Sequence, residues 1–149
     1  MKNKSPAIET LNPDWLGGRG EDGNDEIYRE HILDHYRNPR NSGKLKQYTL
    51  THKEHNPLCG DEIQIYLLVK KEKISSISFE AKGCAISVAS MSLLSEWVKH
   101  KSIKEIKNLK PEKMLEMLGI KLGIVRMKCG LLGLKTILNA LERKNELYH

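Results

Sequence analysis

The sequence predicts an α+β fold in which a three-stranded antiparallel sheet packs against helices. Apolar residues occupy alternate positions in the segments 61–70 and 76–82, which is the period of half-buried β-strands. Only residues 71–75, which begin with a polar turn at 71–73, separate these two segments, and so short a connection favours antiparallel pairing. After residue 84 the apolar spacing becomes helical, which is typical of helices that cover a sheet.

The N-terminal part predicts an extension followed by a helix. Residues 1–24 combine prolines and glycines with acidic residues, so we expect a mobile extension ahead of a folded domain at 25–149. A first helix is expected at 25–37, where Asp25 caps an apolar stripe of Tyr28, Ile32, Leu33 and Tyr36. His31 and His35 lie four positions apart, a spacing that permits metal binding. No glutamate lies between them as in zinc proteases, and we favour a structural role.

The remaining elements follow from breaks and periodicity. Pro39 ends the first helix, because proline cannot continue one and disfavours helical geometry in the residue before it. A first strand is expected at 47–52, with Tyr48 and Leu50 on one face, ahead of the two strands already named. Helices are expected from Gly83–Cys84 to about residue 100, at 103–108, at 111–118 and, after an irregular stretch, from Cys129 onward.

Composition limits the classes of function. At 149 residues the chain is long enough for one domain with a real core, and no apolar run approaches the ~20 residues of a membrane helix. The net charge of +6 invites an acidic partner. A nucleic-acid-binding module is disfavoured, because the chain has one Phe, no aromatic RNA-binding signature and no zinc-finger spacing. We expect a solvated basic surface, with neither nucleic acid nor membrane as partner.

Cysteine usage favours a reducing compartment. Three cysteines are an odd number, which argues against a disulfide framework. The first residues lack the apolar core of a secretory signal and carry Glu9 and Asp14, unlike a transit peptide. We therefore expect a cytoplasmic protein.

Each cysteine is expected where a loop enters a strand or helix. Cys59 and Asp61 lie at the mouth of the strand 61–70, while Cys84 and Cys129 are expected at helix N-termini, which lower the pKa of a thiol. Thiolates together with a carboxylate are typical of a metal site. The cysteines are far apart in sequence, so spacing alone also allows them to be separate small hydrophobic residues.

Four segments carry a resemblance to a known family: IYREHILDHYRNPRNSGKL, HNPLCGDEIQIYL, FEAKGCAISVASMSLL and VRMKCGLLGLKTILNAL. In the same order and over about residues 26–143, they resemble the U-type iron–sulfur cluster assembly scaffolds, the IscU/SufU/NifU N-terminal-domain family. The resemblance implies an α+β scaffold (SufE/IscU-like) on which a [2Fe-2S] cluster is built from iron and sulfur. A cysteine desulfurase would supply the sulfur, and apo iron–sulfur proteins would receive the transient cluster.

The resemblance also implies a ligand set. Cys59, Cys84 and Cys129 match the three family cysteines, and Asp61 matches the aspartate of the Cys-Gly-Asp motif, which is associated with cluster lability and can ligate zinc. An oxygen ligand in place of a fourth thiolate should hold a cluster less firmly. Zn²⁺ is also expected to fill such a site in the isolated protein.

Two departures leave the subtype open. Lys128 stands where the better-known scaffolds have a histidine before the last cysteine, and the Pro-Pro-Val-Lys segment read by a dedicated chaperone is absent. Arg126 is similar to the SufU branch, whose members are described as zinc-bound sulfur-transfer partners of the desulfurase. That branch carries an insertion between its second and third cysteines, for which the interval from Cys84 to Cys129 is too short.

Two readings therefore remain. In the first, the chain is a scaffold without enzymatic turnover, and Cys129 first accepts sulfur. In the second it is a zinc-dependent sulfurtransferase on the same residues, with Cys59 as another candidate acceptor. In either, the Lys128 cation should lower the pKa of the Cys129 thiol, and Arg126 should pair with Asp61 or steer the partner.

Overall fold

The computed structural model describes residues 23–57 and 60–147. The expected extension at 1–24 lies outside the described residues, except for its last two positions, which belong to the first helix. The elements in chain order are α1 (Gly23–Arg37), β1 (Leu50–Asn56), β2 (Asp61–Lys70), β3 (Lys73–Lys82), α2 (Ala85–Val98), α3 (Ile103–Lys107), α4 (Pro111–Leu118) and α5 (Ile124–Leu147).

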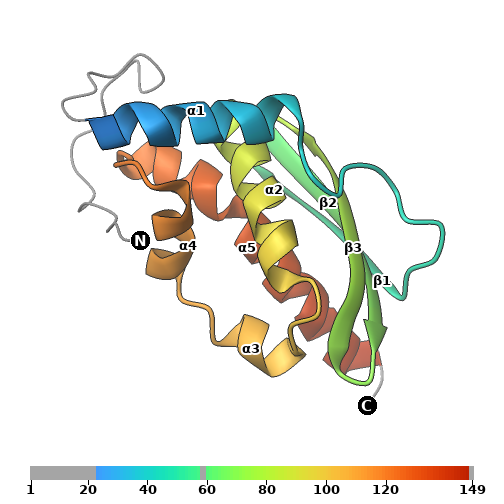
Figure 1. Ribbon diagram of the computed structural model, residues 1–149. Helices are drawn as coiled ribbons and strands as arrows, with labels where there is room; N and C mark the ends of the chain where they lie inside the picture. Colours follow the sequence, from blue (N-terminus) through green and yellow to red (C-terminus); the bar gives the residue numbers. More distant parts are fainter. Residues whose placement is uncertain (1–22, 58–59, 148–149) are drawn as a thin grey trace.

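The three strands form one antiparallel sheet in the order β1-β2-β3, as the sequence predicts (Figure 1). The turn between β2 and β3 places Lys71 and Glu72 at φ 54° and 63°, the left-handed geometry of a tight hairpin. At the other end of β2, Asn56 pairs with Asp61 as the last pair between β1 and β2. Register therefore places Asp61 at one end of the sheet.

The first strand lies three to four residues later than predicted. Leu50 is buried as expected, but Tyr48 lies outside the strand and is 38% exposed. The sequence of β1, Leu-Thr-His-Lys-Glu-His-Asn, contains one apolar residue, so no hydrophobic alternation marks it. Its position is set instead by its ladder with β2.

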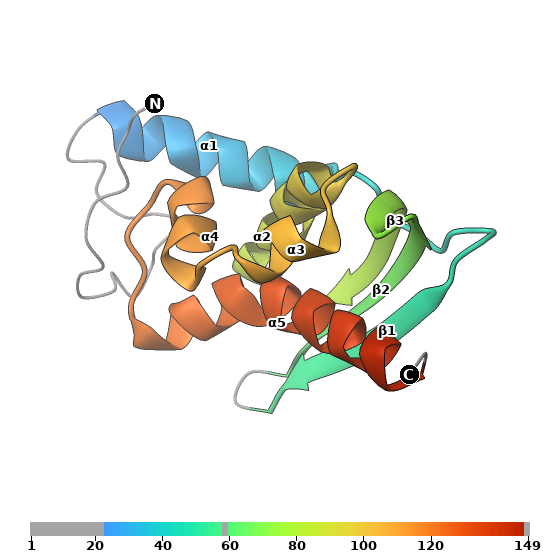
Figure 2. The same cartoon turned by 90° about the horizontal axis from the view of Figure 1, so that it is seen from below.

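Helices α2 and α5 cover one face of the sheet, and α1 packs on α2 (Figures 1 and 2). The core between these layers joins alternate residues of β2 and β3 to the inward faces of both helices: Ile63, Ile65, Leu67, Ile77, Phe79, Met91, Leu94, Val98, Leu134, Ile137 and Leu141. A smaller apolar cluster lies among α1, α2, α4 and the start of α5 and includes Ile32, Ile86, Leu118, Leu122 and Cys129.

Three helical predictions need correction. Helix α1 begins at Gly23, so Asp25 lies inside the helix and is not its N-cap. In α1, Tyr36 is 43% exposed, and the buried position of that turn is His35. Helix α5 begins at Ile124 rather than at Cys129, because residues 124–128 contain neither proline nor glycine and the amide of Met127 already donates to the carbonyl of Gly123. Cys129 therefore lies in the second turn, where the helix dipole acts weakly.

Among the described helices, none is both long enough and apolar enough to cross a membrane.

Candidate metal centre

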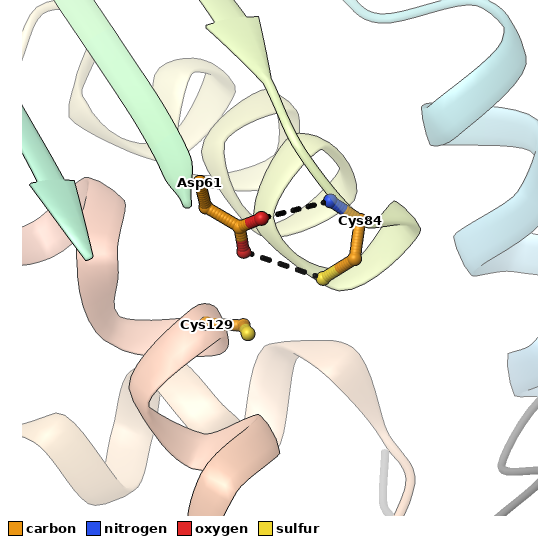
Figure 3. Close-up of side chains that lie close together, drawn as sticks. All are labelled: Asp61, Cys84 and Cys129. Atoms are coloured by element: carbon orange, nitrogen blue, oxygen red, sulfur yellow. Dashed lines mark hydrogen bonds between the residues drawn. The ribbon is translucent and has the colours of Figure 1, made fainter. Parts of the chain in front are cut away.

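Three of the predicted ligand residues meet at one end of the sheet. Asp61 is the first residue of β2, Cys84 is the N-cap of α2, and Cys129 lies in α5. One potential ligand atom from each residue lies within 4.8 Å of the others. Figure 3 shows the Asp61 carboxylate and the Cys84 sulfur turned toward each other, with the Cys129 sulfur facing the same space.

The Asp61 carboxylate is held on both oxygens. Asp61 is only 3% exposed, so its carboxylate is buried. Oδ1 accepts the backbone N–H of Cys84 at 3.2 Å, and Oδ2 accepts the hydroxyl of Ser87 and the thiol of Cys84, the latter at 3.5 Å. These donors offset the cost of burying a carboxylate away from water.

Gly83 permits the close approach of Asp61 to α2. Its φ of +147° lies in the region that L-residues rarely adopt, and a Cβ there would lie 2.9 Å from Asp61 Cβ and closer to the carboxylate. Cys84 follows in extended geometry, and its side chain makes no capping hydrogen bond to the helix. The thiol of Cys84 is thus directed at the carboxylate instead of at the backbone of α2.

Cys129 is held in a well-packed position. It is 1% exposed and belongs to the smaller apolar cluster. One turn further along α5, Gly133 allows a close crossing with α2, since a Cβ there would lie 3.5 Å from the Cα of Met91. The contact between the two helices brings Cys129 near Cys84.

The donor set fits a thiophilic metal. Tetrahedral coordination with bonds of about 2.0–2.3 Å places ligand atoms roughly 3.4–3.8 Å apart. The three ligand atoms all lie within 4.8 Å of one another, so a small inward adjustment would allow them to share one ion. Two thiols and one carboxylate suit Zn²⁺ or an iron–sulfur centre better than they suit Mg²⁺ or Ca²⁺.

The other predicted site residues differ in how the structure places them. Cys59 lies outside the described residues, and its part as a ligand stays a prediction. Arg126 is half-buried in the first turn of α5, and Lys128 is exposed. Lys128 lines a depression of about 350 Å³ between the end of β1 and α5, together with His55, Asn56, Pro57, Leu131, Leu132 and Lys135.

Sequence reasoning missed this depression and the contacts of Ser87. The groups around the depression come from segments about seventy residues apart and share no pattern in sequence. Ser87 stands three positions after Cys84 on a predicted helix, and this spacing places both residues on one face of the helix. The spacing was the one sequence signal that Ser87 lies beside the site.

The His31–His35 pair takes no part in this cluster. The two rings meet edge-on with their centroids 4.7 Å apart. His35 is buried, and its Nδ1 lies 2.7 Å from the hydroxyl of Ser92, which also accepts the backbone N–H of Arg40 at 2.9 Å. Burial lowers the pKa of His35, and the nearby Arg40 charge adds to this effect. The structure thus supports the structural role, in which His35 ties α1 to α2.

Comparisons with known proteins identify relatives of this chain. The profile of the NifU-like N terminal domain matches residues 27–146. The chain is 37% identical over 93 residues to the iron–sulfur cluster assembly scaffold protein IscU 1 of Archaeoglobus fulgidus, covering 62% of this chain and 61% of that protein. It is 39% identical over 80 residues to the zinc-dependent sulfurtransferase SufU of Bacillus subtilis, covering 54% of each. The chain thus spans little more than half the length of these relatives.

A solved structure shows the same fold. The crystal structure of FiSufU from Fervidobacterium islandicum AW-1, described as a scaffold protein for the SUF system, superimposes with a TM-score of 0.64 and 32% identity. The match covers 78% of this chain and 97% of that one. Since the family profile spans four fifths of the sequence and the fold agrees, the chain belongs to the family of NifU-like N-terminal domains.

Proposed function

We propose that this protein is an iron–sulfur cluster assembly scaffold, which builds a [2Fe-2S] cluster and passes it to apo-proteins. The observation that carries the proposal is the meeting of Asp61, Cys84 and Cys129 from three distant segments at one end of the sheet. Membership of a family whose relatives include a protein named as such a scaffold supports it. The cluster is the cargo of this reaction.

The residues divide into firm and labile ligands. Cys84, Cys129 and Cys59 would supply thiolates, and Asp61 would supply the weaker oxygen ligand. A carboxylate that is already hydrogen-bonded to Ser87 and to the amide of Cys84 remains stable when the metal leaves. The scaffold can therefore release its cargo without stranding a buried charge.

Sulfur would arrive from a cysteine desulfurase as a persulfide. The thiolate of Cys129 attacks the outer sulfur, the S–S bond of the desulfurase persulfide breaks, and the desulfurase thiolate leaves, so that Cys129 carries the persulfide. Cys129 is 1% exposed, so this attack requires the segment that leads into α5 to open when the desulfurase docks. Lys128 and Arg126, one and three residues before Cys129, would support the thiolate and steer the partner.

A second candidate is a zinc-dependent sulfurtransferase that serves the same desulfurase. The observation that favours it is the similarity to SufU of Bacillus subtilis, whose name states this activity. Here Zn²⁺ would occupy the same residues, a cysteine would carry persulfide, and no stable cluster would form.

Anaerobic reconstitution separates the two. The metal-free full chain is incubated with Fe²⁺, cysteine and a cysteine desulfurase, and visible absorption and transfer to an apo-ferredoxin are measured. A transferable chromophore that is lost in Cys84→Ser and Cys129→Ser supports the scaffold. Zinc-dependent stimulation of the desulfurase without a chromophore would contradict the scaffold and support the zinc-dependent sulfurtransferase.

A further inference from the structure

The hydroxyl of Ser87 touches all three residues of the centre. Ser87 lies in the first turn of α2, is 0% exposed, and follows Cys84 by three positions. Its Oγ is in hydrogen-bond contact with Asp61 Oδ2, lies 3.4 Å from the backbone carbonyl of Cys129 and lies 3.7 Å from Cys84 Sγ. A buried serine at the junction of three segments can influence how they hold a common ligand.

The hydrogen bond of Ser87 falls on the oxygen that faces the thiols. Oδ2 is the carboxylate oxygen that lies 3.5 Å from Cys84 Sγ, and Figure 3 shows it on the side of Cys129. The other oxygen, Oδ1, is turned to the backbone of Cys84. The oxygen placed to bind a metal therefore already accepts a hydrogen bond from the Ser87 hydroxyl.

The Ser87 hydroxyl has one proton and, besides the Cys84 sulfur at 3.7 Å, two oxygen acceptors of different kinds within reach. An ionised carboxylate and a backbone carbonyl can only accept, so the hydroxyl donates to one of them at a time. A hydrogen bond to a charged oxygen is stronger than one to a neutral carbonyl, and the shorter contact is the one to Asp61. The carbonyl of Cys129 remains as a second acceptor once Oδ2 is taken by a metal.

We propose that Ser87 is a positioning residue that keeps Asp61 an exchangeable ligand. Its hydroxyl stabilises the metal-free carboxylate, so an incoming metal must displace the hydrogen bond from Ser87 in order to bind Oδ2. On metal binding the hydroxyl turns to the carbonyl of Cys129, and on release it returns to Asp61. This inference rests on the proposed metal-binding function of the three residues and adds a determinant of release.

Asp61 is also held by contacts that do not involve Ser87. The amide of Cys84 holds Oδ1, and the backbone of Gly83 packs against the carboxylate. Ser87→Ala therefore leaves Asp61 in place but removes a donor from the metal-free state. The substitution removes more stabilising free energy from the metal-free state than from the metal-bound state. Metal should therefore be held about ten-fold more tightly and released more slowly.

Release of Co²⁺ from the full chain measures this effect. Co²⁺ bound to thiolates absorbs in the near ultraviolet, and its transfer to excess EDTA is followed as this absorption decays. Ser90→Ala is the matched control, since Ser90 is 1% exposed on the same helix and donates only to the carbonyl of Ser87 among the contacts described. Thermal unfolding of the metal-free proteins is recorded alongside.

The result expected is slower release from Ser87→Ala, unchanged release from Ser90→Ala, and no effect of Ser87→Ala when Asp61→Ala is already present. Faster or unchanged release from Ser87→Ala would overturn the inference, as would an equal effect in the Asp61→Ala background, which marks a merely structural role. Absence of thiolate absorption in the wild-type chain would instead refute the proposed centre itself.

Discussion

The carboxylate of Asp61 and the backbone of Gly83 are in direct contact, although the two residues lie on different elements. The contact closes the space between the start of β2 and the start of α2, so that Asp61 Oδ1 reaches the amide of Cys84. A side chain at residue 83 would occupy the position of the carboxylate. Glycine is therefore required here for the approach of a ligand as well as for the φ of +147°.

Gly83→Ala should displace Asp61 and weaken metal binding. The added methyl group collides with the carboxylate, and the strained backbone should lower the free energy of unfolding by about 1–3 kcal/mol. Gly43→Ala is the control, because Gly43 has φ +114° but open space around its Cβ position. Chemical denaturation and Zn²⁺ affinity are measured for both. Equal loss of zinc affinity in the two variants would show that contact with Asp61 is irrelevant.

His35 should make stability fall in mild acid. The pKa of His35 is lowered in the folded state from its ordinary 6.5, so the unfolded chain binds the proton first and folding loses free energy as pH falls below that value. His35→Gln should flatten the dependence of unfolding free energy on pH between about 7 and 5. His55→Gln serves as the exposed counterpart. A slope that persists in His35→Gln contradicts the assignment.

Glu54 should stabilise the junction of β1 and α5. Its Oε2 accepts the Nε2–H of His52 and the amide of Asn139, both at 2.7 Å. Burial alone would raise the pKa of Glu54, but these hydrogen bonds outweigh burial and lower it below 4.5. The stability is thus present above that pH and is lost as pH falls through the lowered pKa.

Asn139→Ala should therefore cost about 1–2 kcal/mol of unfolding free energy at neutral pH and reduce the acid dependence below pH 4.5. Lys53→Ala, which breaks an exposed pair between Lys53 of β1 and Glu62 of β2, should change stability by less than about 0.5 kcal/mol. Denaturant titrations at pH 7 and pH 4 compare them. Similar small losses of unfolding free energy in both variants would show that Glu54 does not stabilise this junction.

Lys128→Ala should slow sulfur transfer to Cys129. Without the neighbouring cation a smaller fraction of the thiol is ionised, but each thiolate is a stronger nucleophile, which partly compensates. A roughly three-fold slower transfer is therefore expected. Lys135→Ala is the control, because Lys135 lines the same depression about 10 Å further along α5. Single-turnover transfer from ³⁵S-labelled desulfurase persulfide gives the rates. Equal rates for Lys128→Ala and wild type would leave Lys128 without a role in transfer.

Strong local signals explain the parts of the fold that sequence predicted. The strand at 61–70 and the helix at 111–118 match β2 and α4. The first has regular apolar alternation, and the second begins with Pro111 and ends at Gly119 in left-handed geometry. Such signals act over a few neighbouring residues and need no tertiary context.

The errors lie where tertiary pairing decides. The edge strand β1 has a polar sequence, and its ladder with β2 sets its bounds. The last helix was predicted to begin at Cys129 after an irregular stretch, whereas α5 begins at Ile124. Gly130 lies inside the helix, where a Cβ would be 3.2–3.4 Å from Leu118, Leu115 and Leu122.

The candidate site was predictable in its residue types but not in its geometry. Asp61 and Cys84 each lie next to a glycine, and family resemblance grouped them with Cys129. Long separations in sequence left their meeting to the fold. The contacts of Ser87 depend on the angle at which α2 meets β2, which no sequence period encodes.

Zinc affinity tests the central claim most directly, namely that Asp61, Cys84 and Cys129 jointly hold one metal. The metal-free wild type and Asp61→Ala, Cys84→Ser and Cys129→Ser are titrated with Zn²⁺ against a chromophoric chelator under reducing conditions. We predict one tightly held ion per wild-type chain and affinities at least about 100-fold weaker in each variant. Wild-type affinity in two or more of these variants would contradict the claim.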